Sequence, residues 1–229
     1  MRAGGPRPAR RHRVFTPATG NENYFILSTS HYSNSLLACQ RPKIQHDDRD
    51  VADGFVVTGQ MQAQWEAARL IESHALGVEH SFIYVFKDES GDPHSNFGNY
   101  GLIHTNLAPK KALGTINRVT DLLLGLKPNS EFPKTYDVPA NFVWQDYRNY
   151  RFDAGDESKA LIALWQGSHQ GSAVSLKIHQ PGARTVTLCD PVSGKQSPLS
   201  FSWDLNDPNR RTVVIRTSVS DTPELLLIQ

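Results

Sequence analysis

The spacing of apolar residues predicts two amphipathic helices in the first half of the chain. Apolar side chains recur at three- and four-residue steps over residues 58–77 and 106–125. Residues 23–29 and 80–88 are instead short apolar and aromatic runs, typical of strands. The order strand, helix, strand, helix over 23–125 predicts parallel strands that are joined by crossover connections.

The pattern also predicts which side chains of these elements are buried. The expected buried stripes are Met61, Trp65, Ala68, Ile71 and Ala75 in the first helix, and Leu113, Ile116, Val119 or Thr120, Leu123 and Leu124 in the second. The run at 80–88 is almost continuously apolar, which is typical of a strand buried on both faces of a sheet.

The helical period disappears beyond a proline-rich connector at residues 126–139. Short β-prone runs follow at 160–166, 173–179, 184–190, 211–217 and 224–229, separated by turns rich in Gly, Pro and Asp. This pattern predicts an antiparallel sheet or a small sandwich. We therefore expect three parts, which are an Arg/Pro-rich disordered tail at 1–20, an α/β domain at 21–130 and an all-β domain at 131–229.

Composition and charge restrict the classes of function. The 229 residues are 38% hydrophobic, enough for a packed core, and the net charge of +1 argues against a general nucleic-acid binder. No stretch approaches the roughly 18 apolar residues of a membrane span, so we expect neither a nucleic-acid nor a membrane partner. Residues 1–20 hold five arginines, three prolines and no acid, without the apolar run of a signal peptide. A targeting or nucleic-acid arm is the alternative for this tail, and the compartment stays open.

Metal and cofactor motifs are not expected. Cys39 and Cys189 lie far apart and match neither a metal-binding spacing nor a disulfide framework. His46 and the acids of the loop 47–53 do not have EF-hand spacing, and solvated acids are expected there rather than a cation site.

Several motifs of residues 62–112 occur together in a characteristic order. They are Gln62-Ala63, Ala75-Leu76-Gly77-Val78, Tyr84 with Asp88, Tyr100-Gly101-Leu102 and Pro109-Lys110-Lys111-Ala112. In this order they resemble the last quarter of the clan A glycoside hydrolase (β/α)8 barrel, closest to the β-xylosidase-like and cellulase-like families. The runs ALIALW, VTLCDPVSGK and TPELLLI are similar to the sandwich domain that often follows such barrels.

The resemblance covers about residues 22–229 and implies a fold and a ligand. The implied fold is α/β plus all-β: the last two βα units of an incomplete (β/α)8 (TIM) barrel, followed by a small antiparallel β-sandwich. The implied ligand is an oligo- or polysaccharide, with no cofactor. Open barrel strands would favour self-association.

The resemblance also implies that catalytic groups are missing. Retaining glycosidases use two carboxyl groups about 5–5.5 Å apart, as nucleophile and as acid/base. In clan A the nucleophile ends the seventh strand, which corresponds to residues 24–30, and Thr29 stands where the Glu belongs. A Thr hydroxyl without a base does not replace that carboxylate. Glu22 precedes the strand, on the opposite face, and the fourth strand with its acid is not in this chain. We therefore expect a truncated or degenerate form without turnover.

The resemblance places further residues near a substrate. His31 and Tyr32 follow Thr29 at the same strand end, and Tyr84, Asp88 and Glu89 end the last strand, where they would contact a sugar. Solvated loop acids are the alternative for Asp88 and Glu89.

Other functions are also compatible with the sequence. A non-catalytic carbohydrate-binding or protein-interaction module could use the β domain, although core packing or domain docking is favoured for Trp144, Trp165 and Trp203, and a core position for Trp65. An incomplete gene model would also explain a quarter barrel behind an Arg/Pro-rich start.

Overall fold

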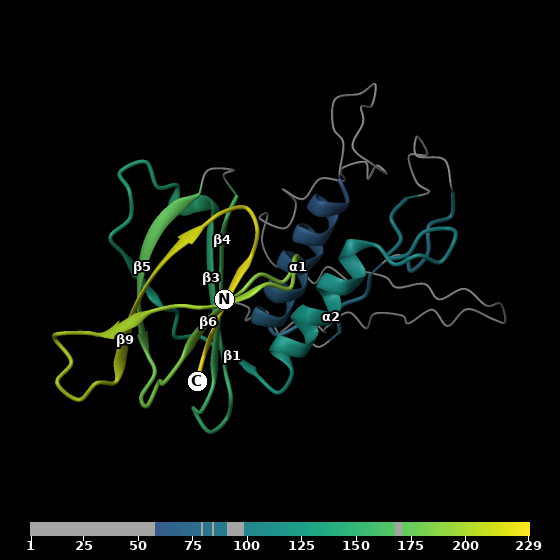
Figure 1. Ribbon diagram of the computed structural model, residues 1–229. Helices are drawn as coiled ribbons and strands as arrows, with labels where there is room; N and C mark the ends of the chain where they lie inside the picture. The colour runs from purple at the N-terminus through teal and green to yellow at the C-terminus, as the bar shows by residue number, and fades with distance from the viewer. Residues whose placement is uncertain (1–57, 79, 84, 91–98, 168–170) are drawn as a thin grey trace, which may run out of the picture.

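The computed structural model describes residues 58–78, 80–83, 85–90, 99–167 and 171–229. Two helices, α1 (Gly59–Ala75) and α2 (Lys111–Leu123), lie beside a β-sandwich (Figure 1). Both predicted helices are thus present. The hydroxyl of Thr58 caps α1 by accepting a hydrogen bond from the Met61 backbone N–H (3.1 Å). Neither described helix has the length and hydrophobicity to cross a membrane.

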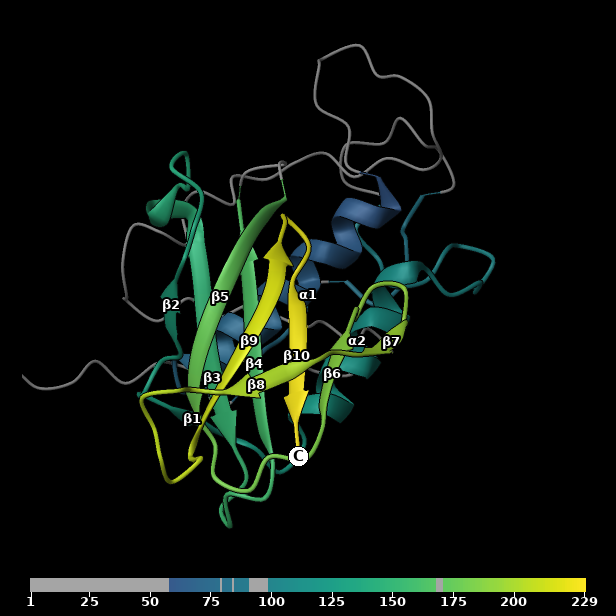
Figure 2. The same ribbon diagram turned by 60° about the vertical axis from the view of Figure 1, so that its left-hand side comes forward.

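The β-rich half forms two antiparallel sheets, which can be followed in Figure 2. One has the order β1-β3-β4-β10-β6-β7 and the other β2-β5-β9-β8. The strands are β1 (Lys127–Asn129), β2 (Lys134–Tyr136), β3 (Tyr147–Asp153), β4 (Ala160–Gln166), β5 (Ser172–His179), β6 (Val186–Cys189), β7 (Gln196–Pro198), β8 (Phe201–Trp203), β9 (Thr212–Val219) and β10 (Glu224–Ile228), with a short 3-10 helix η2 (Trp144–Asp146) before β3. The predicted sandwich is therefore present.

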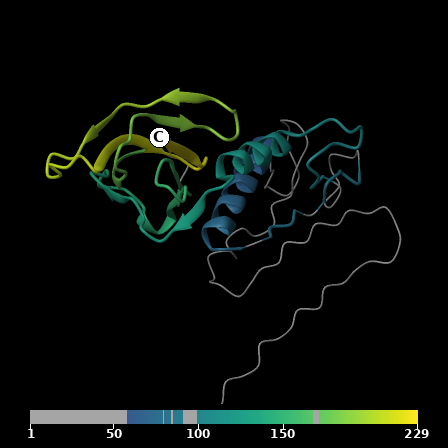
Figure 3. The same ribbon diagram turned by 90° about the horizontal axis from the view of Figure 1, so that it is seen from below.

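The six-stranded sheet is covered on both faces. Along β4, Ile162 and Leu164 point into the core between the two sheets, whereas Leu161 and Trp165 point toward the helices. The molecule thus has three layers: the four-stranded sheet, the six-stranded sheet and the helix pair, which lies beside the sandwich in Figure 3. Burial of each large apolar side chain contributes about 1.5–3 kcal/mol.

The buried stripe of each helix differs slightly from the predicted one. In α1 the buried side chains are Gln62, Ala63, Ala67 and Ile71, while Met61, Trp65 and Ala68 are half-buried. In α2 they are Ala112, Thr115, Val119 and Leu123, and Leu124, just past the helix end, is 76% exposed. Alanines at positions 63 and 67 let the backbone of α1 approach its neighbours closely. The helix therefore packs through its alanine face and leaves the bulky Trp65 half-buried.

Polar contacts also join the helices to the six-stranded sheet. The Tyr150 hydroxyl of β3 donates to Glu72 of α1 (2.9 Å). The ring of His74 stacks on Phe152, with centroids 5.3 Å apart. These contacts fix α1 on the sheet.

The barrel part of the predicted fold is not confirmed. The predicted strand at 23–29 lies outside the described residues. In the described part of 80–88, the backbone makes only one isolated parallel bridge, between Lys87 and Ile103, and forms no strand. Phe82 and Phe86 are each 41% exposed, so the expected burial on both faces is absent there. Such burial requires neighbouring strands and helices, which the described residues do not supply.

The boundary between the predicted domains stays a prediction. Strand β1 begins at Lys127 and pairs with β3, so residues just before the predicted boundary at 130/131 already belong to the six-stranded sheet.

Candidate functional site

Two of the six residues predicted at a site belong to the described chain. Thr29, His31, Tyr32 and Tyr84 lie outside the described residues, as does Glu22. Asp88 and Glu89 are described, and their environments differ sharply. The Asp88 side chain is 1% exposed, whereas Glu89 is an exposed residue.

Asp88 is the centre of a buried polar group that we call the Asp88 cluster, made of Asp88, Asn99, Gly101, His104 and Lys110. Its Oδ1 accepts hydrogen bonds from the Gly101 backbone N–H (2.8 Å) and the Lys110 Nζ (2.6 Å). His104 Nδ1 lies 3.6 Å from the other carboxylate oxygen. Lys110 Nζ also donates to the Asn99 carbonyl (3.0 Å). The carboxylate thus accepts hydrogen bonds from two residues and has the imidazole of a third close by.

The backbone around the cluster is fixed by main-chain hydrogen bonds. Asp88 N–H donates to Ile103 O (2.9 Å), and Lys110 N–H donates to Leu102 O (2.9 Å). At Gly101, a Cβ atom would lie 2.3 Å from the Asp88 nitrogen, so only glycine fits this close approach. The cluster therefore joins the end of the 80–88 segment to the residues that lead into α2.

Burial dominates the electrostatics of the cluster. It lowers the pKa of the Lys110 ammonium, and the hydrogen bond and the charge of Asp88 partly offset this effect. The ammonium, 6% exposed at its side chain, thus depends on its carboxylate partner. This arrangement suits a positioning role, in which Asp88 holds the loop before α2. A contact of Asp88 or Glu89 with a sugar stays a prediction.

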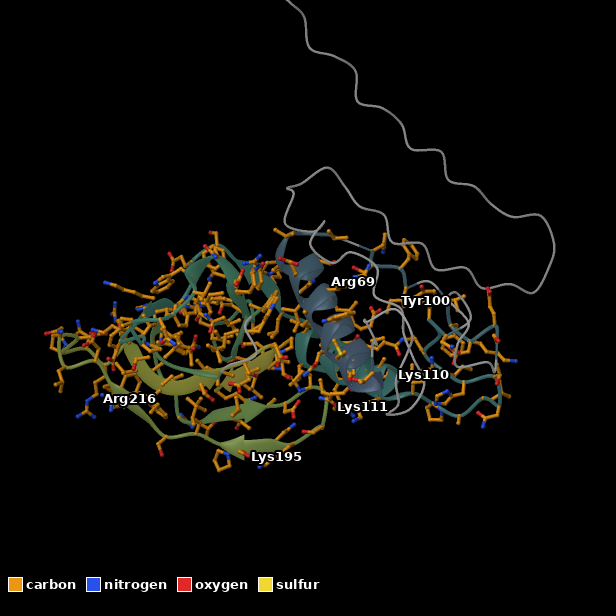
Figure 4. All side chains as sticks on the ribbon, turned by 90° about the horizontal axis from the view of Figure 1, so that it is seen from above. Arg69, Tyr100, Lys110, Lys111, Lys195 and Arg216 are labelled. Atoms are coloured by element: carbon orange, nitrogen blue, oxygen red, sulfur yellow. The ribbon has the colours of Figure 1, made fainter. Side chains whose placement is uncertain are left out.

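The Asp88 cluster lies at the helical end of the molecule. Figure 4 shows Tyr100, Lys110 and Lys111 there, whereas Arg216 lies on the sandwich. Gln62 of α1 reaches the same region, since its Nε2 donates to the carbonyl of Gly101 (3.1 Å). Within the described part of the chain, no group of three or more His, Cys, Asp or Glu side chains is arranged to hold a metal ion.

The tryptophans of the β domain occupy three different environments. Trp165 is 8% exposed and packs between β4 and the helices, as core packing predicts. Trp203 is half-buried against Phe201, with ring centroids 5.7 Å apart. Trp144 is 55% exposed, so the expectation of core packing is wrong for this residue. Its position on η2, which has no buried residue, explains the exposure.

Two members of the cluster, Lys110 and His104, were not predicted from the sequence. Lys110 is part of the Pro109-Lys110-Lys111-Ala112 motif, but the adjacent lysines are indistinguishable in sequence, and the structure buries the first and exposes the second. His104 lies in a loop without periodicity. The neighbouring Tyr100-Gly101-Leu102 motif was the available signal, because its glycine is the point where the Asp88 backbone comes close.

A hollow lies between α2 and the turn after β6. Arg118, Asp121, Cys189 and Gln196 are among the residues that line it. The Arg118 guanidinium donates to the carbonyls of Pro191 (2.7 Å) and Val192 (2.6 Å). These bonds give the cation a structural role in holding the turn against α2.

A scan against protein-family models finds no match, and a sequence search of curated proteins finds none either. The fold is nevertheless similar to that of a family 39 glycoside hydrolase from the gut symbiont Bacteroides cellulosilyticus WH2. The similarity has a TM-score of 0.51 at 18% sequence identity and covers 75% of this chain and 31% of that enzyme. The chain therefore spans about a third of the length of the enzyme.

A cycloisomaltooligosaccharide glucanotransferase from Paenibacillus sp., solved with cycloisomaltoheptaose, is a more distant match. It gives a TM-score of 0.35 at 10% identity, covering 59% of this chain and 23% of that one. The similarity to the family 39 enzyme shows that this chain has a glycoside hydrolase-like fold.

Proposed function

We propose that this chain is a glycoside hydrolase-like protein of carbohydrate metabolism, which binds carbohydrate but does not hydrolyse it on its own. The observation that carries the proposal is the fold shared with the family 39 glycoside hydrolase over 75% of the chain. The clan A motifs within residues 62–112 support the same assignment from the sequence.

We propose the absence of turnover because the resemblance to clan A assigns no suitable carboxylate pair to the residues of this chain. The resemblance puts Thr29 at the nucleophile position, and an unactivated hydroxyl does not form the glycosyl intermediate. The same resemblance assigns none of residues 22–229 to the strand that carries the acid/base. Asp88 is held by Lys110 and Gly101, which makes it a poor nucleophile or proton donor.

The test is an activity assay on the purified full chain with aryl β-xylosides, β-glucosides and α-arabinofuranosides. We expect no turnover above the uncatalysed rate. The proposal of inactivity is overturned by turnover that Asp88→Asn or Glu22→Gln abolishes while the chain stays folded. Glu131→Gln is the control, because it neutralises an exposed carboxyl group that is not among the predicted site residues.

Binding is measured separately on the same preparation, by affinity electrophoresis in gels that contain xylan, mixed-linkage β-glucan or arabinan. We expect retardation by at least one polysaccharide. A chain that neither binds nor hydrolyses any of them has no carbohydrate role, whatever its fold.

A protein-interaction role is the second candidate, and the 80–88 segment favours it. Phe82 and Phe86 are each 41% exposed, and the described backbone there makes only one isolated bridge. A strand from a second copy of the chain would cover both rings and pair with the backbone. Sedimentation velocity would then show a dimer that Phe82→Ser with Phe86→Ser dissociates. A monomer at all concentrations would contradict this role.

A further inference from the structure

Trp144 is a large apolar side chain that the fold leaves at the surface. It begins η2, between β2 and β3, and 55% of its surface is exposed. Its ring packs edge-to-face on two other rings, those of Phe142 (centroids 4.8 Å apart, 72° between planes) and Tyr147 (6.1 Å, 85°). Phe142 is 8% exposed and belongs to the core between the sheets. The indole is therefore anchored on one side and open to solvent on the other.

The rings behind Trp144 are themselves fixed. The Tyr147 hydroxyl shares a hydrogen bond with the Thr135 hydroxyl of β2 (2.9 Å), and its ring packs against Phe142 (5.2 Å, 67°). The backbone of η2 is held as well, because Gln166 Nε2 donates to the Val143 carbonyl (3.1 Å). A ring held in this way loses little conformational entropy when a ligand stacks on it.

The surroundings of Trp144 supply hydrogen-bonding groups without a concentration of charge. Gln145 and Asp146, the next two residues, are exposed. Arg148 donates to the Gln145 carbonyl (2.9 Å) and lies 3.6 Å from Glu72 of α1, so its charge is compensated. An exposed aromatic ring, in a short turn that also exposes an amide and a carboxylate, matches a neutral ligand that has one apolar face and a rim of hydroxyl groups. A pyranose ring has this form.

We propose that the surface formed by Trp144, Gln145 and Asp146, here the Trp144 surface, binds one pyranose unit of an oligosaccharide. The C–H face of the sugar stacks on the indole, and its hydroxyls bond to the amide of Gln145 and the carboxylate of Asp146. The proposal rests on the carbohydrate role proposed above for its choice of ligand. None of its three residues belongs to the Asp88 cluster or to the residues predicted at the site.

The test measures the binding of xylohexaose and of cellohexaose to the folded full chain. Isothermal titration calorimetry gives the affinity, and tryptophan emission reports whether an indole is covered. We expect at least one of the two to bind and to shift the emission, because an indole is covered. Trp144→Ala should weaken binding about tenfold or more, and Trp144→Phe, which keeps an aromatic face, should weaken it less. Phe132→Ala is the matched control, because this residue is also an exposed aromatic, at 60%, on the loop between β1 and β2.

Several outcomes overturn the proposal. If Trp144→Ala binds the oligosaccharide as tightly as the wild type, the Trp144 surface is not the site, although the carbohydrate role stands. If neither oligosaccharide binds the wild type, the proposal fails, and the polysaccharide gels decide separately whether the carbohydrate role fails with it. A dimer that Trp144→Ala dissociates would assign the surface to a second copy of the chain. If Trp144→Ala strongly lowers the melting temperature, Trp144→Phe and Asp146→Asn are tested in its place. Unchanged affinity of both variants for the oligosaccharide would then contradict the proposal.

Discussion

Asp88 and Glu89 show how much the surroundings decide at the scale of single residues. The two acids are adjacent in sequence and were predicted to share a role, yet one is buried against Lys110 and the other is exposed. Sequence could place both after an apolar run, but the burial of Asp88 depends on Gly101, thirteen residues further along the chain. A loop contact of this kind has no periodicity from which it could be predicted.

Replacing Asp88 should destabilise the fold far more than replacing Glu89. Asp88→Asn removes the charge that compensates the buried Lys110 ammonium, and breaking such a pair costs about 3–5 kcal/mol. Glu89→Gln should change the free energy of unfolding by less than about 0.5 kcal/mol. Urea denaturation measures both values. Adding Lys110→Met to Asp88→Asn should recover part of the loss, and equal effects of the two single variants would contradict the buried ion pair.

Glu224 makes the stability depend on pH. Burial and the negative charge of Asp190 raise its pKa to about 7, against the hydrogen bond from Thr217. The folded chain thus holds this proton more tightly than the unfolded chain, where the pKa is near its ordinary 4.5. The stabilisation is complete below about pH 4.5 and is lost as the pH rises through 7.

Stability should therefore fall between pH 5 and pH 8, by about 1–2 kcal/mol from this group once its partial solvation is allowed for. Glu224→Gln has no charge to lose, so its melting temperature should change less over this range and should exceed that of the wild type at pH 8. Glu89→Gln is the control, which should keep the wild-type slope. A wild-type slope in Glu224→Gln would show that another group is responsible.

At the scale of elements, the sequence pattern predicts a helix or strand well where neighbouring elements cover it. It fails for an apolar run that has no such neighbours. β4 and β10 match apolar runs in the sequence, because a strand with both faces covered needs apolar residues at every position. The run at 80–88 is also mostly apolar and aromatic. Among the described residues, however, it has no neighbouring strands with which to form a sheet. The exposure of Trp144 could not be read from the sequence, because η2 has no apolar pattern to place it.

Arg118 should couple α2 to the sandwich. Its guanidinium donates to the carbonyls of Pro191 and Val192, both in the turn between β6 and β7. Arg118→Met keeps the aliphatic stem and removes both hydrogen bonds, which should cost about 1–3 kcal/mol. Hydrogen exchange should quicken in α2 and in this turn, while β5 and β9 keep their protection. A uniform increase over the whole chain would instead indicate a general loss of stability.

In the whole molecule, the two helices cover the outer face of the six-stranded sheet and form a second core with it. Leu161, Trp165 and Leu225 of the six-stranded sheet pack against α1 and α2, so the sheet would expose an apolar face without them. The change of sequence pattern predicts a domain boundary near residue 130. Side chains from both sides of this position nevertheless pack into one core. The helices and the sandwich should unfold together.

Two matched core variants test this expectation. Ile71→Ala removes a buried side chain of α1 from the helix–sheet core, and Ile215→Ala removes one of β9 from the core between the sheets. Each should cost about 2–5 kcal/mol. Because the six-stranded sheet belongs to both cores, each variant should shift one common transition, seen alike by far-ultraviolet circular dichroism and by tryptophan emission. If Ile71→Ala instead melts the helices at a lower temperature and leaves the sandwich transition unchanged, the chain consists of two independent units, and the sequence boundary is also a boundary of folding.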